Sequence, residues 1–146
     1  MMQPIDLPTV EGTGVPSPNL AEADVDVVHR FVEAVAREEA GTIKSRFFAA
    51  DFVEHEAGVD FGAQEFIASL VARRARFPDV AWTVELLVSV AGLVVCHSTM
   101  THREPTGAIA RGRETVVLRI ENGRFAECWR MCDERLSAAD ECAGGP

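Results

Sequence analysis

Residues 114–132, "ETVVLRIENGRFAECWRMC", decide the fold, because they combine two strand-like runs with a tight turn. Asn122-Gly123 joins the runs, and this dipeptide is the strongest short signal for a two-residue β-hairpin. Residues 80–90 and 93–102 form a similar pair of runs around Ala91-Gly92. The sequence therefore predicts a four-stranded antiparallel meander. The polar segment 103–114, with Pro105 and two glycines, is predicted to be a long, mobile crossing between the two hairpins.

The N-terminal half shows a helical period. Apolar residues recur every three or four positions after Ala21 and predict an amphipathic helix that ends at Gly41. Residues 42–52 read as a short second helix or turn that buries its phenylalanines, and a third helix follows Gly62 and stops before Pro78. Three helices followed by a meander predict an α+β domain over residues 21–136. Residues 1–20 are predicted to be a flexible arm and residues 137–146 a disordered tail.

Composition and charge argue against several classes of function. A net charge of −9 argues against nucleic acid and against an anionic membrane surface as partners. The longest apolar run, residues 88–96, is too short to span a bilayer. The start of the chain lacks the pattern of a secretory signal, and the four cysteines show no CxxC spacing. We therefore expect free thiols and a cytoplasmic protein.

Three segments together resemble a known family. They are "FFAADFVEHEAGVDFGAQEF", "FPDVAWTVELLVSVAGLVVCHSTMTH" and "RIENGRFAECW", and in this order they are similar to SnoaL-like polyketide cyclases of the NTF2-like superfamily. The resemblance implies a cone in which three N-terminal helices pack on a curved, mostly antiparallel four-stranded sheet and enclose a pocket. It also implies a homodimer formed through the outer face of the sheet. Residues 99–107 would lie near the mouth of the cone, where they could act as a lid.

The same resemblance implies a function. The expected activity is cofactor-free ring closure in a hydrophobic polyketide-type substrate during antibiotic biosynthesis. Two mechanisms stay open: an acid–base, aldol-type closure, and a shape-driven cycloaddition in which positioning alone lowers the barrier.

Two residues are candidates for catalysis by their motif positions. Asp133 follows the last strand, and a carboxylate at an apolar wall would have a raised pKa suited to proton abstraction. The alternative is that Asp133 lies past the strand end in solvent. His55 could stabilise an oxyanion or shuttle a proton, or it could be a helix-end histidine bonded to backbone.

Strand alternation predicts the wall of the pocket. If Trp129 faces the cone, Glu127 and Met131 do so as well, and Cys128 and Arg130 then face outward. The expected substrate-binding residues are Trp129, Met131, Glu127, Leu118 and His102. No His/Cys/Asp cluster has metal-ligand spacing, so no metal site is expected.

Two other functions remain alternatives. Limonene-epoxide hydrolases share the fold and use an Asp–Arg–Asp relay, but Met131 stands where that family places an Asp after Trp-Arg. Arg111, Arg113 and Glu114 leave a partial relay conceivable. The other alternative is a non-catalytic small-molecule binder or scaffold, because one fold hosts many functions.

Overall fold

The computed structural model describes residues 18–132, with side chains from Ala21 onward. Asp133, the tail 137–146 and nearly all of the arm 1–20 lie outside these described residues. The elements, in order, are α1 (Pro18–Arg37), α2 (Ala40–Phe47), β1 (Phe48–Glu56), β2 (Val59–Phe61), α3 (Ala63–Arg76), β3 (Ala81–Val90), β4 (Leu93–Arg103), β5 (Ile109–Glu121) and β6 (Arg124–Cys132).

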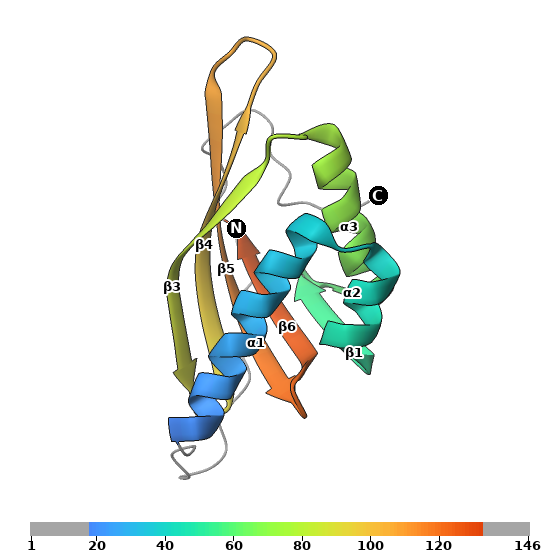
Figure 1. Ribbon diagram of the computed structural model, residues 1–146, viewed down its shortest axis with the longest axis vertical. Helices are drawn as coiled ribbons and strands as arrows, with labels where there is room; N and C mark the ends of the chain where they lie inside the picture. The colour runs from blue at the N-terminus through green and yellow to red at the C-terminus, as the bar shows by residue number, and fades with distance from the viewer. Residues whose placement is uncertain (1–17, 133–146) are drawn as a thin grey trace.

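The strands form one six-stranded sheet in the order β2-β1-β6-β5-β4-β3. β1 and β6 are parallel, and every other neighbouring pair is antiparallel. The three helices lie along one side of this curved sheet (Figure 1), and a concave space lies between the two layers. The α+β class and the mostly antiparallel sheet agree with the sequence prediction.

The predicted strand count of four is wrong, because β1 and β2 were not recognised. Phe48 and Phe52 are four residues apart, and this spacing places two side chains on one face of either a helix or a strand. Both phenylalanines are buried as predicted, but they extend from β1. The first helix also differs from expectation: it begins at Pro18 and ends at Arg37, and Gly41 lies inside α2.

The two hairpins read from the sequence are confirmed. At Ala91-Gly92 the φ angles are 50° and 80°, and at Asn122-Gly123 they are 52° and 73°. Positive φ at both central residues is the conformation of a type I′ turn, whose twist matches that of the flanking strands. These turns fix the registers of β3 with β4 and of β5 with β6.

The long, mobile crossing predicted for residues 103–114 is wrong. β4 and β5 pair without interruption as far as Arg103 and Ile109, so only residues 104–108 form the connecting loop. Backbone hydrogen bonds from Glu104 N to Ala108 O and from Gly107 N to Glu104 O close this loop. The β4–β5 hairpin projects beyond the helices (Figure 1). Within the segment 99–107, residues 99–103 are therefore paired strand and residues 104–107 belong to this loop.

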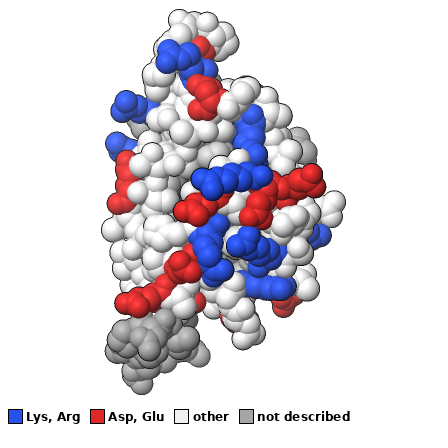
Figure 2. All heavy atoms as spheres, viewed as in Figure 1, with Lys and Arg blue, Asp and Glu red and all other residues white. Residues whose placement is uncertain are grey.

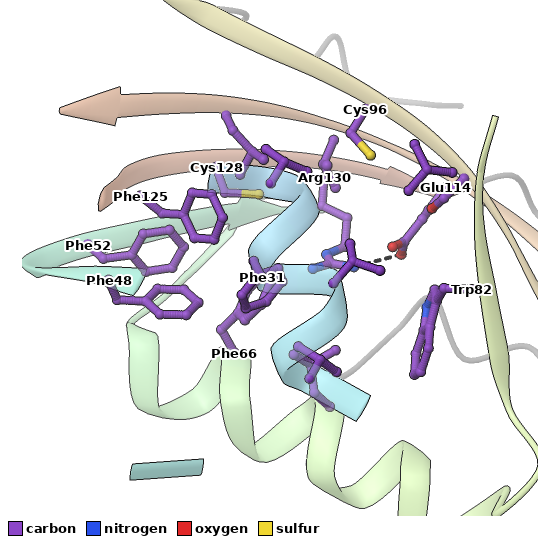
Figure 3. A pocket seen from close by; sticks show the side chains of 18 residues that line it. Phe31, Phe48, Phe52, Phe66, Trp82, Cys96, Glu114, Phe125, Cys128 and Arg130 are labelled. Carbon is purple, nitrogen blue, oxygen red and sulfur yellow. Dashed lines mark hydrogen bonds and ion pairs between the residues drawn. The ribbon is translucent and has the colours of Figure 1, made fainter. Parts of the chain in front are cut away.

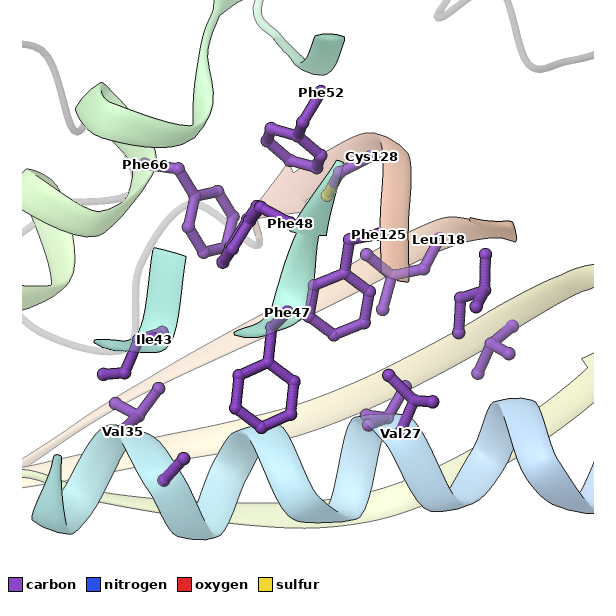
Figure 4. Close-up of a cluster of buried hydrophobic side chains, with 14 of the residues drawn as sticks. Val27, Val35, Ile43, Phe47, Phe48, Phe52, Phe66, Leu118, Phe125 and Cys128 are labelled. Carbon is purple, nitrogen blue, oxygen red and sulfur yellow. The ribbon is translucent and has the colours of Figure 1, made fainter. Parts of the chain in front are cut away.

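Phenylalanine rings join the two layers (Figure 4). Phe31 of α1 makes edge-on contacts with Phe47, Phe48 and Phe125, with ring centroids 5.0–5.8 Å apart. Phe47 and Phe125 are 1% exposed, so the cluster reaches into the fully buried core. Because Phe31 and Phe66 stand between the core and the concave space, the same rings also form one wall of the pocket described below.

Three other sequence expectations concern cysteines, charge and membranes. Cys96 and Cys128 are free and buried, but Cys132 is disulfide-bonded, which corrects the expectation of free thiols for that residue. Acidic and basic side chains lie next to one another on the face seen in Figure 2, without a continuous basic surface there. Within residues 18–132, no helix combines the length and apolar character needed to cross a bilayer.

Candidate functional site

The concave space between sheet and helices is a pocket of about 740 Å³, a volume that includes the part open to solvent. Side chains from α1, α3 and every strand except β2 line it, and most of them are aliphatic or aromatic (Figure 3). Only a small fraction of this space is wide enough for a water molecule. A ligand with several rings would therefore have to displace wall side chains such as Phe31, Leu70 or Trp82.

A buried guanidinium forms the polar end of this pocket. Arg130 Nη1 donates a 2.7 Å hydrogen bond to Glu114 Oε2, while Arg130 Nη2 and Nε donate to Glu54 Oε2 at 3.0 and 3.2 Å. The Arg130 side chain is 9% exposed, and its Cζ lies 4.9 Å from the centroid of the Phe66 ring. Arg130 is therefore held in place by two carboxylates and an aromatic face.

The three strands that supply this cluster are neighbours in the sheet. β1 contributes Glu54, β6 contributes Arg130, and β5 contributes Glu114. Glu54 opposes Cys128 in the β1–β6 register, and Glu114 opposes Cys132 in the β5–β6 register. Arg130 lies between these two positions on β6, so its long side chain can reach both carboxylates.

Burial and charge act in opposite directions on the pKa of each partner. Burial lowers the pKa of Arg130, but the nearby Glu114 and Glu54 carboxylates raise it by a larger amount. The guanidinium therefore stays charged. Burial raises the pKa of Glu54, and Arg130 offsets only part of that effect. A buried cation shared by two carboxylates, one of them with a raised pKa, is the kind of group found at acid–base sites.

The two thiols in the pocket wall are unsuited to nucleophilic chemistry. Burial raises the pKa of Cys96 to about 11. Burial also raises the pKa of Cys128, whose side chain is fully enclosed. Because the thiolate is the reactive form, both cysteines act as small apolar groups at neutral pH.

A second, smaller pocket of about 250 Å³, a volume that again includes the part open to solvent, lies on the other side of Arg130. Its lining is largely polar and consists of Glu54, Glu56, Phe66, Ser69, Leu70, Arg73 and Arg130. Arg130, Phe66 and Leu70 line both pockets and so form the partition between them.

Trp129, Met131 and Glu127 do not line either pocket. Beyond Phe125, the residues of β6 that line the apolar pocket are Cys128 and Arg130, which reverses the alternation expected from the sequence for residues 127–131. The aromatic Trp129 was assumed to face the cone, yet it is buried on the outer side of the sheet, against His55. A substrate contact by these three residues thus has no support in this geometry.

His55 also lies on this outer side, in a separate charged cluster. Its Nδ1 is 2.7 Å from Asp60 Oδ1 and its Nε2 is 2.7 Å from Glu127 Oε1. Partial burial lowers the pKa of His55, but the hydrogen bonds to Glu127 and Asp60 raise it by more. Glu127 in turn accepts a 3.1 Å hydrogen bond from Arg119 Nε. This cluster ties β2, β1, β6 and β5 together away from the pocket.

The remaining predicted site residues have different surroundings. Leu118 lines the apolar pocket, and a substrate contact there stays a prediction. His102 is 4% exposed and stacks on Phe77 with ring centroids 3.9 Å apart, outside the lining of both pockets. Within residues 18–132, no three His, Cys, Asp or Glu side chains are grouped to hold a metal ion.

Sequence reasoning missed Glu54 and Arg130 as pocket residues and considered Glu114 only for a partial relay. One signal was available. Arg130 stands within an otherwise mainly apolar strand end, and a charge on a buried strand face needs partners of opposite charge. The sequence does not show which of the many acidic residues supply them, because Glu54 is 76 positions away.

Comparison with solved structures supports the fold. AclR from Streptomyces galilaeus, named a putative hydroxylase, is 18% identical with a TM-score of 0.69, over 79% of this chain and 78% of AclR. A putative SnoaL-like polyketide cyclase from Jannaschia sp. CCS1 is 17% identical with a TM-score of 0.68, over 84% of this chain and 92% of the cyclase. IdmH from Streptomyces antibioticus, a putative polyketide cyclase, is 21% identical with a TM-score of 0.64, over 75% of this chain and 91% of IdmH. No curated protein matches the sequence.

Helices packed on one side of a curved sheet around an apolar pocket define an NTF2-like protein, and the structural neighbours agree with that class. The family model of the SnoaL-like polyketide cyclases matches residues 26–139, so the chain belongs to that family.

Proposed function

We propose that this protein is a cofactor-free cyclase that closes a ring in a hydrophobic, polyketide-type substrate during antibiotic biosynthesis. The observation that carries the proposal is the buried Arg130–Glu114 pair at the end of a pocket that is otherwise apolar. Apolar walls hold the carbon chain of such a substrate, and a small number of polar groups fix its reacting atoms.

Glu114 is the base in the proposed aldol-type closure. Its carboxylate removes a proton from a carbon next to a substrate carbonyl, and the electrons of the broken C–H bond form an enolate. Arg130 has five N–H groups, of which three donate to Glu114 and Glu54. We assign the other two to the enolate oxygen, whose charge a fixed cation stabilises.

Ring closure then returns the proton. The enolate carbon attacks a second carbonyl of the same chain, a C–C bond forms, and the resulting alkoxide takes the proton held by Glu114. The reaction therefore takes up and releases no net proton. Because reactant and base are held together, positioning lowers the barrier in addition to the acid–base effect.

The experiment compares wild type with Glu114→Gln on a linear poly-β-keto thioester, with the cyclised product followed by chromatography and mass spectrometry. Loss of a general base should slow turnover by about 10²–10⁴-fold. Glu121→Gln, on the same strand but exposed, is the matched control and should keep full activity. A decrease of less than tenfold in the Glu114→Gln variant would remove the acid–base mechanism and leave the shape-driven cycloaddition.

Epoxide opening is a second candidate, favoured by one observation. Glu54, Arg130 and Glu114 form a carboxylate–arginine–carboxylate cluster, in which Glu114 was among the relay residues suggested by the sequence and Glu54 and Arg130 were not. If the chain opens epoxides, limonene-1,2-epoxide should be converted to a diol that carries oxygen-18 from labelled water. Absence of diol at high enzyme concentration would eliminate this candidate.

Homodimer formation and a cytoplasmic location remain part of the proposal. Leu86, Val88 and Val90 are 38–54% exposed on the outer side of β3, facing away from the helices. Exposed apolar side chains in a row are typical of a surface that another protein covers. We assign a second copy of this chain to it.

A further inference from the structure

Arg130 separates two pockets of different character, and its two carboxylate partners lie on opposite sides. Glu114 lines only the apolar pocket, and Glu54 lines only the polar one. One guanidinium therefore connects a carboxylate that can meet a substrate to a carboxylate that cannot (Figure 3 shows the first of these contacts).

The charges around Arg130 do not balance when every group is ionised. The groups that face Glu54 are Glu56 on its own strand, Cys128 and Arg130 on β6, Glu114 on β5 and Arg73 on α3. Burial keeps Cys128 protonated, so three carboxylates oppose two guanidinium groups. A partly buried site with one surplus negative charge is stabilised by holding one proton.

The position of that proton follows from burial. Glu54 is 4% exposed, whereas Glu56 is half-buried at the edge of the polar pocket. Burial raises the pKa of both carboxylates. The Glu114 side chain, which is 2.7 Å from Arg130, is more exposed than that of Glu54, 17% against 6%. The surplus proton of the resting cluster therefore belongs on Glu54, the most buried of the three carboxylates.

We propose that Glu54 is a proton reservoir that offsets the charge change of Glu114 during the reaction. When Glu114 takes a proton from the substrate, Glu54 releases its own proton to water in the polar pocket. Arg130 then still has one carboxylate and one carboxylic acid as neighbours, so the total charge of the cluster does not change. When Glu114 gives its proton to the alkoxide, Glu54 takes one back. This role rests on the proposed function of Glu114, and it makes Glu54 a positioning residue that acts through Arg130.

The partition explains how this exchange can occur without wetting the substrate. Ser69, Arg73 and Glu56 are half-buried, so the polar pocket reaches the surface between α3 and β1. Arg130, Phe66 and Leu70 separate it from the apolar pocket. Water at Glu54 thus stays away from an enolate, which water would otherwise protonate before ring closure.

The test titrates Glu54 directly and needs no substrate. The protein is labelled with [δ-¹³C]glutamate, the Glu54 signal is assigned with Glu54→Gln, and its chemical shift is followed with pH. Glu114→Gln keeps the shape of the side chain and imitates its protonated form. In that variant the titration midpoint of Glu54 should fall by at least about one pH unit, because a neighbouring negative charge is removed. Glu121→Gln is the control and should leave the midpoint unchanged.

A second variant protects the test against a folding defect. Glu56→Gln alters a half-buried residue outside the apolar pocket, and it should also lower the Glu54 midpoint, by a smaller amount, because the two carboxylates repel each other. A Glu54 that is ionised throughout the neutral range, or a midpoint that neither variant moves, overturns the reservoir.

The two proposals fail in different ways. If Glu114→Gln abolishes cyclisation but leaves the Glu54 midpoint in place, the reservoir is wrong and the proposed base stands. If the midpoint moves but cyclisation continues at the wild-type rate, Glu114 is not the base and both proposals are wrong.

Discussion

Trp129 and Arg130 are consecutive residues of β6, yet their side chains lie on opposite faces of the sheet. Arg130 donates a 2.7 Å hydrogen bond to Glu114 at the pocket, whereas Trp129 stacks on His55 with ring centroids 5.4 Å apart. The sheet therefore carries two charged clusters, one toward the helices and one away from them. Substitutions in the two clusters should have separable effects on catalysis and on stability.

Removing the cation of the Arg130 cluster while its two carboxylates remain should strongly destabilise the protein. Arg130→Met leaves two largely buried carboxylates without their cation, and we expect the free energy of unfolding to fall by about 3–5 kcal/mol. The triple variant with Glu54→Gln and Glu114→Gln should recover most of that loss. Urea denaturation measures both. A triple variant no more stable than the single one would show that the guanidinium contributes by packing on Phe66 instead.

Glu54 should make stability depend on pH. Its pKa in the folded protein lies above the ordinary value of 4.5, so its contribution is fully present below pH 4.5 and is lost as pH rises through the folded pKa. Glu54→Gln removes this dependence. Relative to wild type, the variant should therefore gain stability as pH rises from 4 toward neutral, within about the 1–3 kcal/mol typical of buried charged groups. Chemical unfolding at a series of pH values checks this trend. A constant difference would mean that Glu54 titrates alike in both states.

His55 should contribute to stability and leave ring closure unaffected. Its raised pKa means that its contribution is fully present below the ordinary value of 6.5 and is lost as pH rises through the folded pKa. His55→Gln should lower stability by less than about 1 kcal/mol at low pH, because the cluster is partly exposed, and by less still at high pH. Cyclisation by the variant should match wild type. A large loss of turnover would instead support the catalytic role that the family resemblance implies for His55.

Substitutions of Phe31 and Phe125 should differ in their effects on stability and on ligand binding, although the two rings are in contact. Phe125 is 1% exposed, so Phe125→Ala should cost about 3–5 kcal/mol. Phe31 is partly exposed to the pocket, so Phe31→Ala should cost less and should enlarge the space available to a ligand. Thermal unfolding compares the costs, and the fluorescence of 1-anilinonaphthalene-8-sulfonate compares the binding. Equal binding by wild type and Phe31→Ala would show that Phe31 does not limit the pocket.

The outer side of β3 should control assembly. Leu86→Glu with Val88→Glu places two charges on the exposed apolar row, and analytical ultracentrifugation should show a monomer where wild type is a dimer. Val71→Glu alters an exposed apolar residue of α3 and is the matched control. A wild-type protein that sediments as a monomer at high concentration would contradict the predicted homodimer.

Elements with local sequence signals could be predicted without the structure. Asn122-Gly123 and Ala91-Gly92 specify their hairpins because each turn needs positive φ at two successive residues. The apolar period of three and four residues identified α1, although not its end points. These signals, with the order of the segments, were sufficient for the α+β class and the family.

The rest of the sheet and the site depend on contacts between distant parts of the chain. Phe48 and Phe52 fit a helix or a strand equally well, and β1 became a strand because it pairs in parallel with β6, far along the chain. Alternation shows that Trp129 and Arg130 face opposite ways, but not which of them faces the pocket. That depends on the side of the sheet that the helices cover. Glu54, Arg130 and Glu114 meet only through the registers of three strands, because contacts between distant residues are set by packing and not by local sequence.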